Sequence, residues 1–333
     1  MTRTTALDTL LPGPLSLAGH RLGTPQQAGA LTMVPVSGPA HPGFAPPRTG
    51  LKLSRVAGYG RVELTNAADS GVAIVPLHIG YIQDRAQNHA LCRSAFLAPG
   101  QRLLFEDACC VQQSQGGYLA GRDQWFFVLP LELRARALDL RGVHGYGKLW
   151  DDIAALNARH GLARRGHLEQ ILSRERPVLT RFQSRLELQP GQVGALFFVA
   201  GRFAGLEIAP DPAYFAEMWA ALVCFAYGVT AHRAEPGPPG EPEPFDTDAP
   251  ADPTGTAGPA GLRGALERDR AARLAEIGRW LADAPAGPAD LHEEDRYPAA
   301  GRDLRLSTVT APHLAGQIVT DGDRTVYASL FTR

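Results

Sequence analysis

The spacing of apolar and polar residues predicts a chain that opens with strands. Short runs in which apolar and polar residues alternate, bounded by Gly, Pro, Asn and Asp, are typical of strands. Such runs lie at Ala30–Val36, Leu51–Val56, Arg61–Asn66, Val72–His78, Arg93–Ala98 and Gln101–Glu106. The more apolar run Trp125–Leu133 predicts a buried strand, and Pro130 would place it at an edge or beside a bulge.

From Tyr146 onward the apolar spacing becomes helical. Leu149, Ile153 and Leu156 recur at helical intervals, and Gly161 follows where a C-terminal cap is common. Asp211-Pro212-Ala213 has the N-cap and first-turn proline of a helix that we expect to continue to Tyr227. A shorter helix is predicted at Arg165–Ser173. Further strands are predicted at Ser184–Leu188, Gly194–Ala200, Leu206–Ile208, Leu304–Thr308, Leu314–Thr320 and Thr325–Phe331.

An acidic segment rich in Pro and Gly interrupts this pattern. Residues 234–261 read AEPGPPGEPEPFDTDAPADPTGTAGPAG and contain too few apolar residues to fix one conformation, so we expect a disordered insertion. After it, Arg263–Ala284 has the spacing of an amphipathic helix.

These elements predict one interrupted domain of class α+β, with a β-rich sheet or sandwich core and packed helices. The expected divisions are an N-terminal extension (1–27), the main domain (28–230), a low-complexity linker (231–262), and a helix with terminal strands (263–333). Because three strands alone would not be stable, the terminal strands are expected to return to the main domain.

Composition fits a globular protein. The chain has 333 residues, of which 44% are hydrophobic and 20% charged, enough for a substantial core. No run approaches eighteen apolar residues, and the first twenty residues lack the features of a signal peptide. We therefore expect a cytoplasmic protein with no membrane partner.

Positive charge is concentrated in the middle of the chain. Residues 1–230 carry 22 basic and 17 acidic side chains, whereas residues 231–333 carry 11 and 17. Residues 134–185 alone hold 11 basic side chains against five acidic ones. A basic surface there could neutralise phosphates, with Arg159, Arg164 and Arg165 as the candidate contacts, although such clustering is also common on solvated helix faces.

The sequence completes no catalytic or metal-binding signature. Gly147-Lys148 is followed by Leu149, so a phosphate-binding loop that requires Ser or Thr is absent, and neither Lys52 nor Lys148 lies in the K-x-D-G context of a nucleotidyltransferase. The four cysteines lack zinc-site spacing and are expected to be buried thiols. His89 and Cys92 would form only half of a metal site. We therefore predict no metal site, and the sequence leaves open whether the protein uses a cofactor.

A polar segment lies between two strand-like runs at YIQDRAQNHALCRSAFLAPG, residues 81–100. Its amides could orient a ligand and His89 could exchange protons near neutral pH, although a histidine bonded locally in a turn would have the same sequence. The segment is therefore a candidate ligand pocket.

Several motifs follow one another along the chain: LTNAADSGVAIVPLHIG, QNH, ALCRSAFLAPGQRL, CCVQQSQGGY, GKLWDDIAALNARHG, VGALFFVAGRFAGLEIAPDPAYFAEMW and RDLRLSTVTAPHLAGQIVTDGDRTVYASLF. Their order resembles a known bacterial family, the ADP-ribosylglycohydrolase- and rhodanese-phosphatase-associated protein domain. The resemblance covers about residues 28–230 and 300–333. Within the family, the chain is similar to a ligase-like DNA-damage-response type from radiation-resistant bacteria.

The resemblance implies an accessory protein that accompanies enzymes of nucleic-acid or nucleotide processing. The family's Gln-Asn-Arg pattern falls on Gln87, Asn88 and His89, so histidine replaces arginine, and a usual glutamate corresponds to Gln112. Trp150 and Arg202 match their motifs. These six residues form the candidate pocket.

Three functions remain open at this point. The first is an accessory protein of DNA damage response or repair that binds DNA, RNA or a partner bearing a nucleotide. The second is an enzyme acting on a nucleotide, an ADP-ribose-type ligand or a nucleic-acid end. The third is a protein-interaction module whose acidic linker recruits a partner, such as a repair protein.

Overall fold

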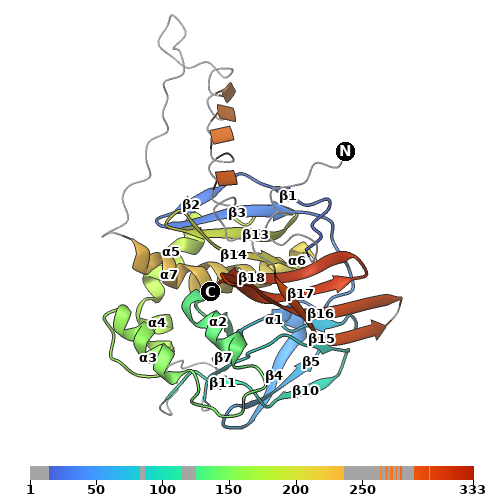
Figure 1. Ribbon diagram of the computed structural model, residues 1–333, viewed down its shortest axis with the longest axis vertical. Coiled ribbons are helices and arrows are strands. Elements are labelled where there is room, and N and C mark those ends of the chain that lie inside the picture. The colour runs from blue at the N-terminus through green and yellow to red at the C-terminus, as the bar shows by residue number, and fades with distance from the viewer. Residues whose placement is uncertain are drawn as a thin grey trace, which may run out of the picture.

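The computed structural model describes residues 15–82, 87–113, 125–235, 289–299 and 301–333, together with isolated positions between 263 and 279. In these ranges the strands pair antiparallel and are combined with a smaller number of helices (Figure 1). The α+β class expected from the sequence is confirmed.

The strands are β1 (Arg21–Leu22), β2 (Gln26–Ala28), β3 (Leu31–Ser37), β4 (Leu51–Gly58), β5 (Arg61–Asn66), β6 (Ala73–Ile74), β7 (Ile79–Ile82), β8 (His89–Ala90), β9 (Phe96–Leu97), β10 (Arg102–Phe105), β11 (Cys109–Cys110), β12 (Trp125–Val128), β13 (Gln192–Val199), β14 (Arg202–Ile208), β15 (Asp290–Ala299), β16 (Arg302–Thr310), β17 (Leu314–Asp321) and β18 (Arg324–Thr332). The helices are α1 (Pro47–Gly50), α2 (Leu131–Asp139), α3 (Trp150–Arg159), α4 (Glu169–Arg174), α5 (Arg176–Arg185), α6 (Pro212–Ala220), the π-helix η2 (Ala221–Tyr227) and α7 (Gly228–Ala234).

The largest sheet in the described part of the chain has nine strands. Its order is β1-β3-β13-β14-β18-β17-β16-β15, and β2 pairs with β3. Strand β14 pairs with β13 on one side and with β18 on the other. The C-terminal strands therefore lie in the same sheet as the first strands of the chain.

Three smaller sheets contain the remaining strands, and their labelled members β4, β5, β7, β10 and β11 lie below the nine-stranded sheet in Figure 1. Their orders are β10-β5-β4, β11-β8-β7-β12 and β6-β9. The hairpin between β4 and β5 turns at Tyr59-Gly60, where Gly60 has a φ of 73°, a conformation that glycine adopts at little cost. This hairpin tip reaches β8 and the chain that leads into α3.

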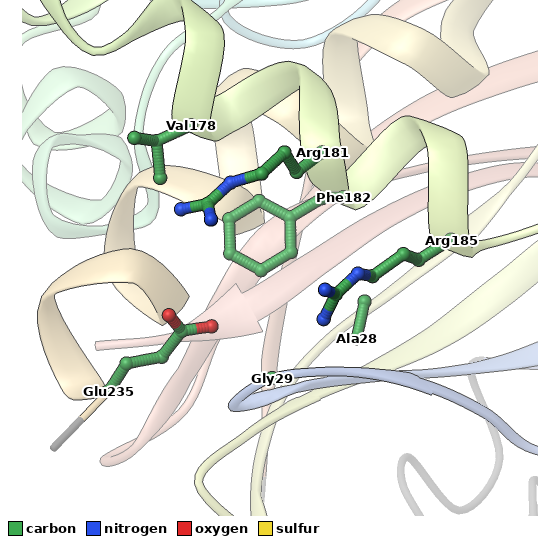
Figure 2. A pocket seen from close by; sticks show the side chains of 7 residues that line it. All are labelled: Ala28, Gly29, Val178, Arg181, Phe182, Arg185 and Glu235. Carbon is green, nitrogen blue, oxygen red and sulfur yellow. The ribbon is translucent and has the colours of Figure 1, made fainter. Parts of the chain in front are cut away.

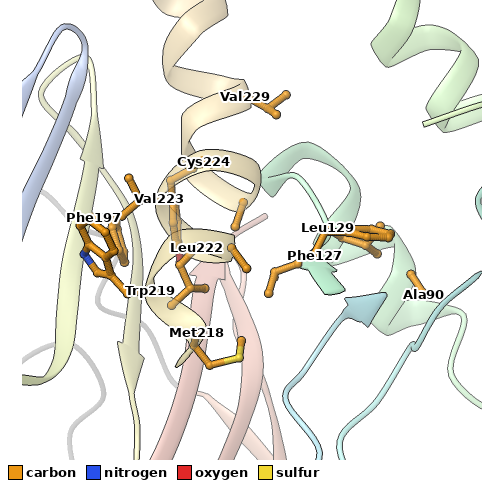
Figure 3. Packing of buried hydrophobic residues seen from close by; sticks show 14 of the residues in the cluster. Ala90, Phe127, Leu129, Phe197, Met218, Trp219, Leu222, Val223, Cys224 and Val229 are labelled. Atoms are coloured by element: carbon orange, nitrogen blue, oxygen red, sulfur yellow. The ribbon is translucent and has the colours of Figure 1, made fainter. Parts of the chain in front are cut away.

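A continuous helical run through α6, η2 and α7 packs between β13 and β12. It begins as its sequence predicts, because the Asp211 carboxylate accepts a hydrogen bond from the Tyr214 amide (2.8 Å) and Pro212 occupies the first turn. Figure 3 shows Trp219, Val223 and Leu222 between Phe197 on one side and Phe127 on the other. These contacts form the centre of the main hydrophobic core.

The same run, Pro212–Ala234, is long and apolar enough to cross a membrane by length and composition alone, the one such helix among the described residues. Of its most apolar window, 61% is buried inside the protein. Its composition is therefore accounted for by its place in the core.

Several elements differ from their sequence-based predictions. The run Trp125–Leu133 does not stay extended: β12 ends at Val128, and Pro130 directly precedes α2. Residues Ser184–Leu188, predicted as a strand, include the end of α5 and its C-cap residue Leu186. The strands predicted at Val72–His78 and Arg93–Ala98 are limited to the short pair β6 and β9.

The predicted linker falls largely outside the described residues. Helix α7 continues to Ala234, beyond the expected boundary at residue 231, whereas residues 236–262 are not described. The helix predicted at Arg263–Ala284 is also described at isolated positions only.

Candidate functional site

Two of the amide residues predicted to line a pocket, Asn88 and Gln112, are brought together, but they bond to each other and to Glu169. The backbone N–H of Asn88 donates to Gln112 Oε1 (3.1 Å), and the side-chain Nδ2 of Asn88 donates to Glu169 Oε2 (3.2 Å). Asn88 and Gln112 are buried. Because buried polar groups need such partners, these side chains join β8 and the end of β11 to α4.

His89 holds the tip of the β4–β5 hairpin. Its Nε2 accepts a hydrogen bond from the Gly60 amide (3.2 Å), so its Nδ1 carries the proton that bonds to the Gln87 carbonyl oxygen (2.8 Å). Burial lowers the pKa of His89, which keeps the ring neutral and able to accept. His89 is only 3% exposed, so its role is to position the hairpin tip.

That tip presents an exposed aromatic group that the sequence analysis missed. The rings of Tyr59 and Tyr146 lie 4.8 Å apart between centroids at 35°, and Tyr146 meets Trp150 edge-on at 5.3 Å. Tyr59 is 57% exposed and Tyr146 is 41% exposed. We call Tyr59, Tyr146 and Trp150 the aromatic row. Its members come from a hairpin tip and a loop far apart in sequence, so no local pattern marks it.

Two of the predicted phosphate contacts lie beside the aromatic row. The Gly166 backbone packs against Trp150 so closely that a Cβ atom at residue 166 would lie 2.5 Å from Trp150 Cβ. The preceding residues, Arg164 and Arg165, are exposed, and the Arg165 carbonyl is fixed by Asn157 Nδ2 (2.7 Å). No carboxylate in the described part of the chain forms an ion pair with either guanidinium. Positive charge therefore adjoins the exposed rings.

Arg159 lies in the last turn of α3, at the opposite end of that helix from Trp150, and is also exposed. After α3, the loop that carries Arg164 and Arg165 is joined to the segment following β11 by two hydrogen bonds between Gln113 and Gly166 (2.7 and 2.8 Å). The loop that carries Arg164 and Arg165 is thus held at both ends.

Not every basic residue of segment 134–185 contributes to a surface. Arg134 is fully buried, and Arg141 forms an ion pair with Glu294 (2.8 Å). Lys148 Nζ donates to the carbonyl oxygens of Asp107 (2.8 Å), Leu140 (3.1 Å) and Val143 (2.5 Å), an arrangement that suits a structural cation. The exposed basic surface is therefore smaller than the sequence count of 11 residues suggests.

A second basic surface belongs to α5. Arg181 and Arg185 line a small hollow with Phe182 and the turn before β3, and Figure 2 shows their guanidinium groups directed toward the side of the hollow that holds Glu235. Glu235 Oε1 accepts a hydrogen bond from the Ala30 amide (3.4 Å). Because a carboxylate faces the two arginines, this hollow is less suited to an anion than the loop beside the aromatic row.

Arg202 lies apart from the other predicted pocket residues. It is exposed at the start of β14 and belongs to the nine-stranded sheet, whereas Gln87, Asn88 and His89 lie at the four-stranded sheet. Trp150, by contrast, lies near Gln112. It packs against Gly166, which is hydrogen-bonded to Gln113, the residue that follows Gln112.

All four cysteines are buried free thiols. Cys92 Sγ and Cys109 Sγ lie 3.3 Å apart, and Cys92 also donates to the Asp107 carbonyl oxygen (3.1 Å). Among the described residues, no group of three or more His, Cys, Asp or Glu side chains could hold a metal ion.

A buried charged cluster at the centre of the molecule was also missed. Arg134 of α2 donates to Glu207 Oε1 of β14 (2.6 Å), to Ser329 Oγ of β18 (2.5 Å) and to His78 Nδ1 (3.3 Å). Tyr227 of η2 donates to the same Glu207 oxygen (2.7 Å). Although burial alone would lower the pKa of Arg134, the Glu207 carboxylate holds it above its ordinary value, so the side chain stays charged.

His78 completes the cluster in an unusual backbone conformation. Its φ is +62°, in the left-handed region that non-glycine residues rarely adopt. Burial, and then the charge of Arg134, lower the pKa of His78 well below its ordinary value. The cluster therefore needs a neutral imidazole that accepts a hydrogen bond from Arg134.

We expect stability to fall as the pH falls below about 6.5, the ordinary value for histidine. His78 and His89 have lowered pKa values in the folded state, so the unfolded state binds more protons in this window and acid favours unfolding. Each histidine can contribute up to about 1.4 kcal/mol per pH unit. Urea titrations at pH 7.5, 6.5 and 5.5 measure the slope.

His78→Asn is the matched variant, since asparagine tolerates the left-handed conformation and offers an acceptor oxygen without titrating. Its free energy of unfolding should depend less on pH than that of the wild type. The exposed His144→Asn variant should keep the wild-type slope. Equal slopes for His78→Asn and the wild type would show that His78 is not the linked group.

Comparison with known proteins identifies a family. A family model described as the ARG and Rhodanese-Phosphatase-superfamily-associated Protein domain matches residues 19–331. The resemblance drawn from the motifs is thus confirmed, and the match extends over the acidic segment and to residue 19 at the N-terminal side. No curated protein and no solved structure matches the chain.

Proposed function

Because the chain belongs to the ARG and rhodanese-phosphatase-superfamily-associated protein family, whose description states no reaction, we propose its function from its own surface: it binds single-stranded nucleic acid without sequence preference. The binding surface is the aromatic row together with Arg159, Arg164 and Arg165. The observation that carries this proposal is the exposed Tyr59–Tyr146 pair beside Trp150, against which the loop of Arg164 and Arg165 packs through Gly166. Neither of these two arginines has an ion-pair partner among the described residues.

Exposed aromatic rings are suited to stacking on bases. Every base has a π face, so stacking tolerates any sequence and contributes about 1–3 kcal/mol per base. A duplex hides those faces, whereas a single strand presents them. Tyr59 and Tyr146 are both exposed, so a base can reach their side chains.

The neighbouring arginines supply the contacts to phosphate. Guanidinium groups bind phosphate oxygens in a bidentate manner, and such contacts position the strand without reading its sequence. Arg164 and Arg165 lie within two residues of Gly166, which packs on Trp150. Bases on the rings and phosphates on the arginines can therefore belong to one strand.

The accessory role in DNA damage response rests on the resemblance of the motifs and is part of the proposal. An enzymatic role has less support. His89 Nε2 and Lys148 Nζ, the two groups considered for proton or nucleotide transfer, are engaged with backbone groups.

The test is the salt dependence of binding to a fluorescein-labelled poly-dT oligonucleotide, followed by anisotropy. Three phosphate contacts predict that log K falls with log salt concentration with a slope of about −2. In the Arg164→Ala/Arg165→Ala variant the slope should become shallower by about 1.4, since each contact contributes about 0.7 on a single strand.

A matched control is Arg55→Ala/Arg305→Ala, which removes two exposed arginines, one from β4 and one from β16, that are not part of the proposed surface. It should keep the wild-type slope. No binding at low salt, or equal slopes for both double variants, would contradict the proposal.

A further inference from the structure

A hollow at one end of the nine-stranded sheet lies outside the surface described above. It has a volume of about 580 Å³ and is lined by three segments: residues 16–21, residues 38–41 and the start of β18. Small-molecule sites commonly have volumes of roughly 300–1,000 Å³. The hollow therefore has room for a ligand the size of a sugar phosphate or a nucleotide.

The ionisable side chains that line this hollow are basic. They are His20, Arg21, His41 and Arg324, and among the described residues no carboxylate lines the hollow. Burial, and then the charges of Arg324 and Arg302, lower the pKa of His41, while Asp321 acts in the opposite direction. Of the three charged groups that influence the pKa of His41, two are therefore positive and one is negative.

The walls of the hollow are fixed by specific contacts. The His41 amide donates to the Pro210 carbonyl oxygen (2.7 Å), and Arg302 donates to the Pro42 carbonyl oxygen and lies over the Phe44 ring at 4.8 Å. These contacts hold the loop that carries His41. In the other two lining segments, the Ser16 amide donates to Thr325 Oγ1 (3.0 Å).

His20 and Gly38 pack together where two of the lining segments meet. His20 is 4% exposed, and its ring occupies the space that a side chain at residue 38 would need. Only glycine leaves room for the ring at this point. The wall is therefore packed, whereas Arg21 and Arg324 remain exposed at the opening.

From this arrangement we propose that the hollow binds the phosphate group of a small phosphorylated molecule. Arg21 and Arg324 bind the phosphate oxygens, since guanidinium forks match their geometry. The remaining volume accommodates the organic part of the molecule. This site is independent of the proposed nucleic-acid surface, which is formed by the aromatic row with Arg159, Arg164 and Arg165.

Calorimetric titration with four probes tests the proposal: AMP, ribose 5-phosphate, adenosine and ribose. AMP and ribose 5-phosphate should bind, and their unphosphorylated counterparts should bind at least about tenfold more weakly, the loss expected for charge-assisted hydrogen bonds to phosphate. The relative affinities of AMP and ribose 5-phosphate show whether a base adds contacts. Adenosine binding as tightly as AMP would overturn the proposal, as would failure of both phosphorylated probes.

Arg21→Ala and Arg324→Ala should each weaken binding of the phosphorylated probes by about tenfold or more. Both residues are exposed, so their replacement should leave thermal unfolding nearly unchanged. Arg305→Ala is the control, because Arg305 is an exposed arginine of the same sheet that lies outside the hollow. Wild-type affinity in both hollow variants would overturn the assignment, whereas their binding of poly-dT should equal that of the wild type.

Discussion

Replacing Arg134 with alanine is expected to lower the free energy of unfolding by about 3–5 kcal/mol, the largest effect predicted for any single change in this chain. Arg134 is fully buried and is the ion-pair partner of Glu207, which is itself only 5% exposed. Removing the guanidinium leaves a buried carboxylate without its counter-ion. Since domains of ordinary size are stable by only about 5–15 kcal/mol, urea unfolding will detect this loss readily.

Two variants separate charge burial from general damage to α2. Arg136→Ala removes a 53% exposed arginine from the same helix and should change stability by less than about 0.5 kcal/mol. Arg134→Met/Glu207→Gln removes both buried charges and should be more stable than Arg134→Met alone, because no unpaired charge remains. If the double variant is no more stable than the single one, Arg134 does not stabilise the folded state through its ion pair with Glu207.

The second large effect concerns nucleic acid. Tyr59→Ala/Tyr146→Ala should weaken binding of a single-stranded oligonucleotide by about tenfold to a hundredfold, because one stacked base contributes about 1–3 kcal/mol. Both rings are largely exposed, so the variant should fold normally. Anisotropy titration at one fixed salt concentration measures the loss.

Tyr59→Phe/Tyr146→Phe is the matched control, since it keeps both rings and removes only the hydroxyl groups. It should bind nearly as well as the wild type. Equal losses in the alanine and phenylalanine variants would indicate hydroxyl contacts in place of stacking, and no loss in either would exclude the aromatic row as the binding surface.

The sequence predicted those elements whose signals are local. Strand β3 and the start of α6 lie where the pattern places them, the latter because Asp211 caps its own helix. Gly161 follows the C-cap residue of α3 with a φ of 68°, as expected for the glycine that ends a helix.

The wrong secondary-structure predictions fall where the sequence patterns of a helix and a strand overlap. In Trp125–Leu133 the apolar run of β12 continues into the first turn of α2, so the boundary at Pro130 is hidden by uniform hydrophobicity. Directly after α5, Leu186 and Leu188 are separated by Glu187, and this strand-like alternation extends the predicted strand back into the end of the helix. The π-helix η2 has no sequence signature that distinguishes it from an α-helix.

The candidate site could be predicted only in part. Arg164 and Arg165 were identified from charge clustering, and both are exposed as a phosphate contact requires. The aromatic row was missed, because Tyr59 and Tyr146 are 87 residues apart and meet only through the docking of a hairpin tip. Arg134 was counted with the basic surface, since its partners Glu207 and Ser329 lie 73 and 195 residues away in sequence.

The most direct test of the proposed function is photocrosslinking of an oligo-dT in which one base is 5-iodouracil, a group that crosslinks to aromatic side chains stacked on it. Peptide mapping by mass spectrometry then locates the crosslink on the full chain. We predict crosslinks at Tyr59 or Tyr146 that disappear when unlabelled single-stranded DNA is added in excess. Crosslinks confined to other parts of the chain, or none at low salt, would contradict the proposal.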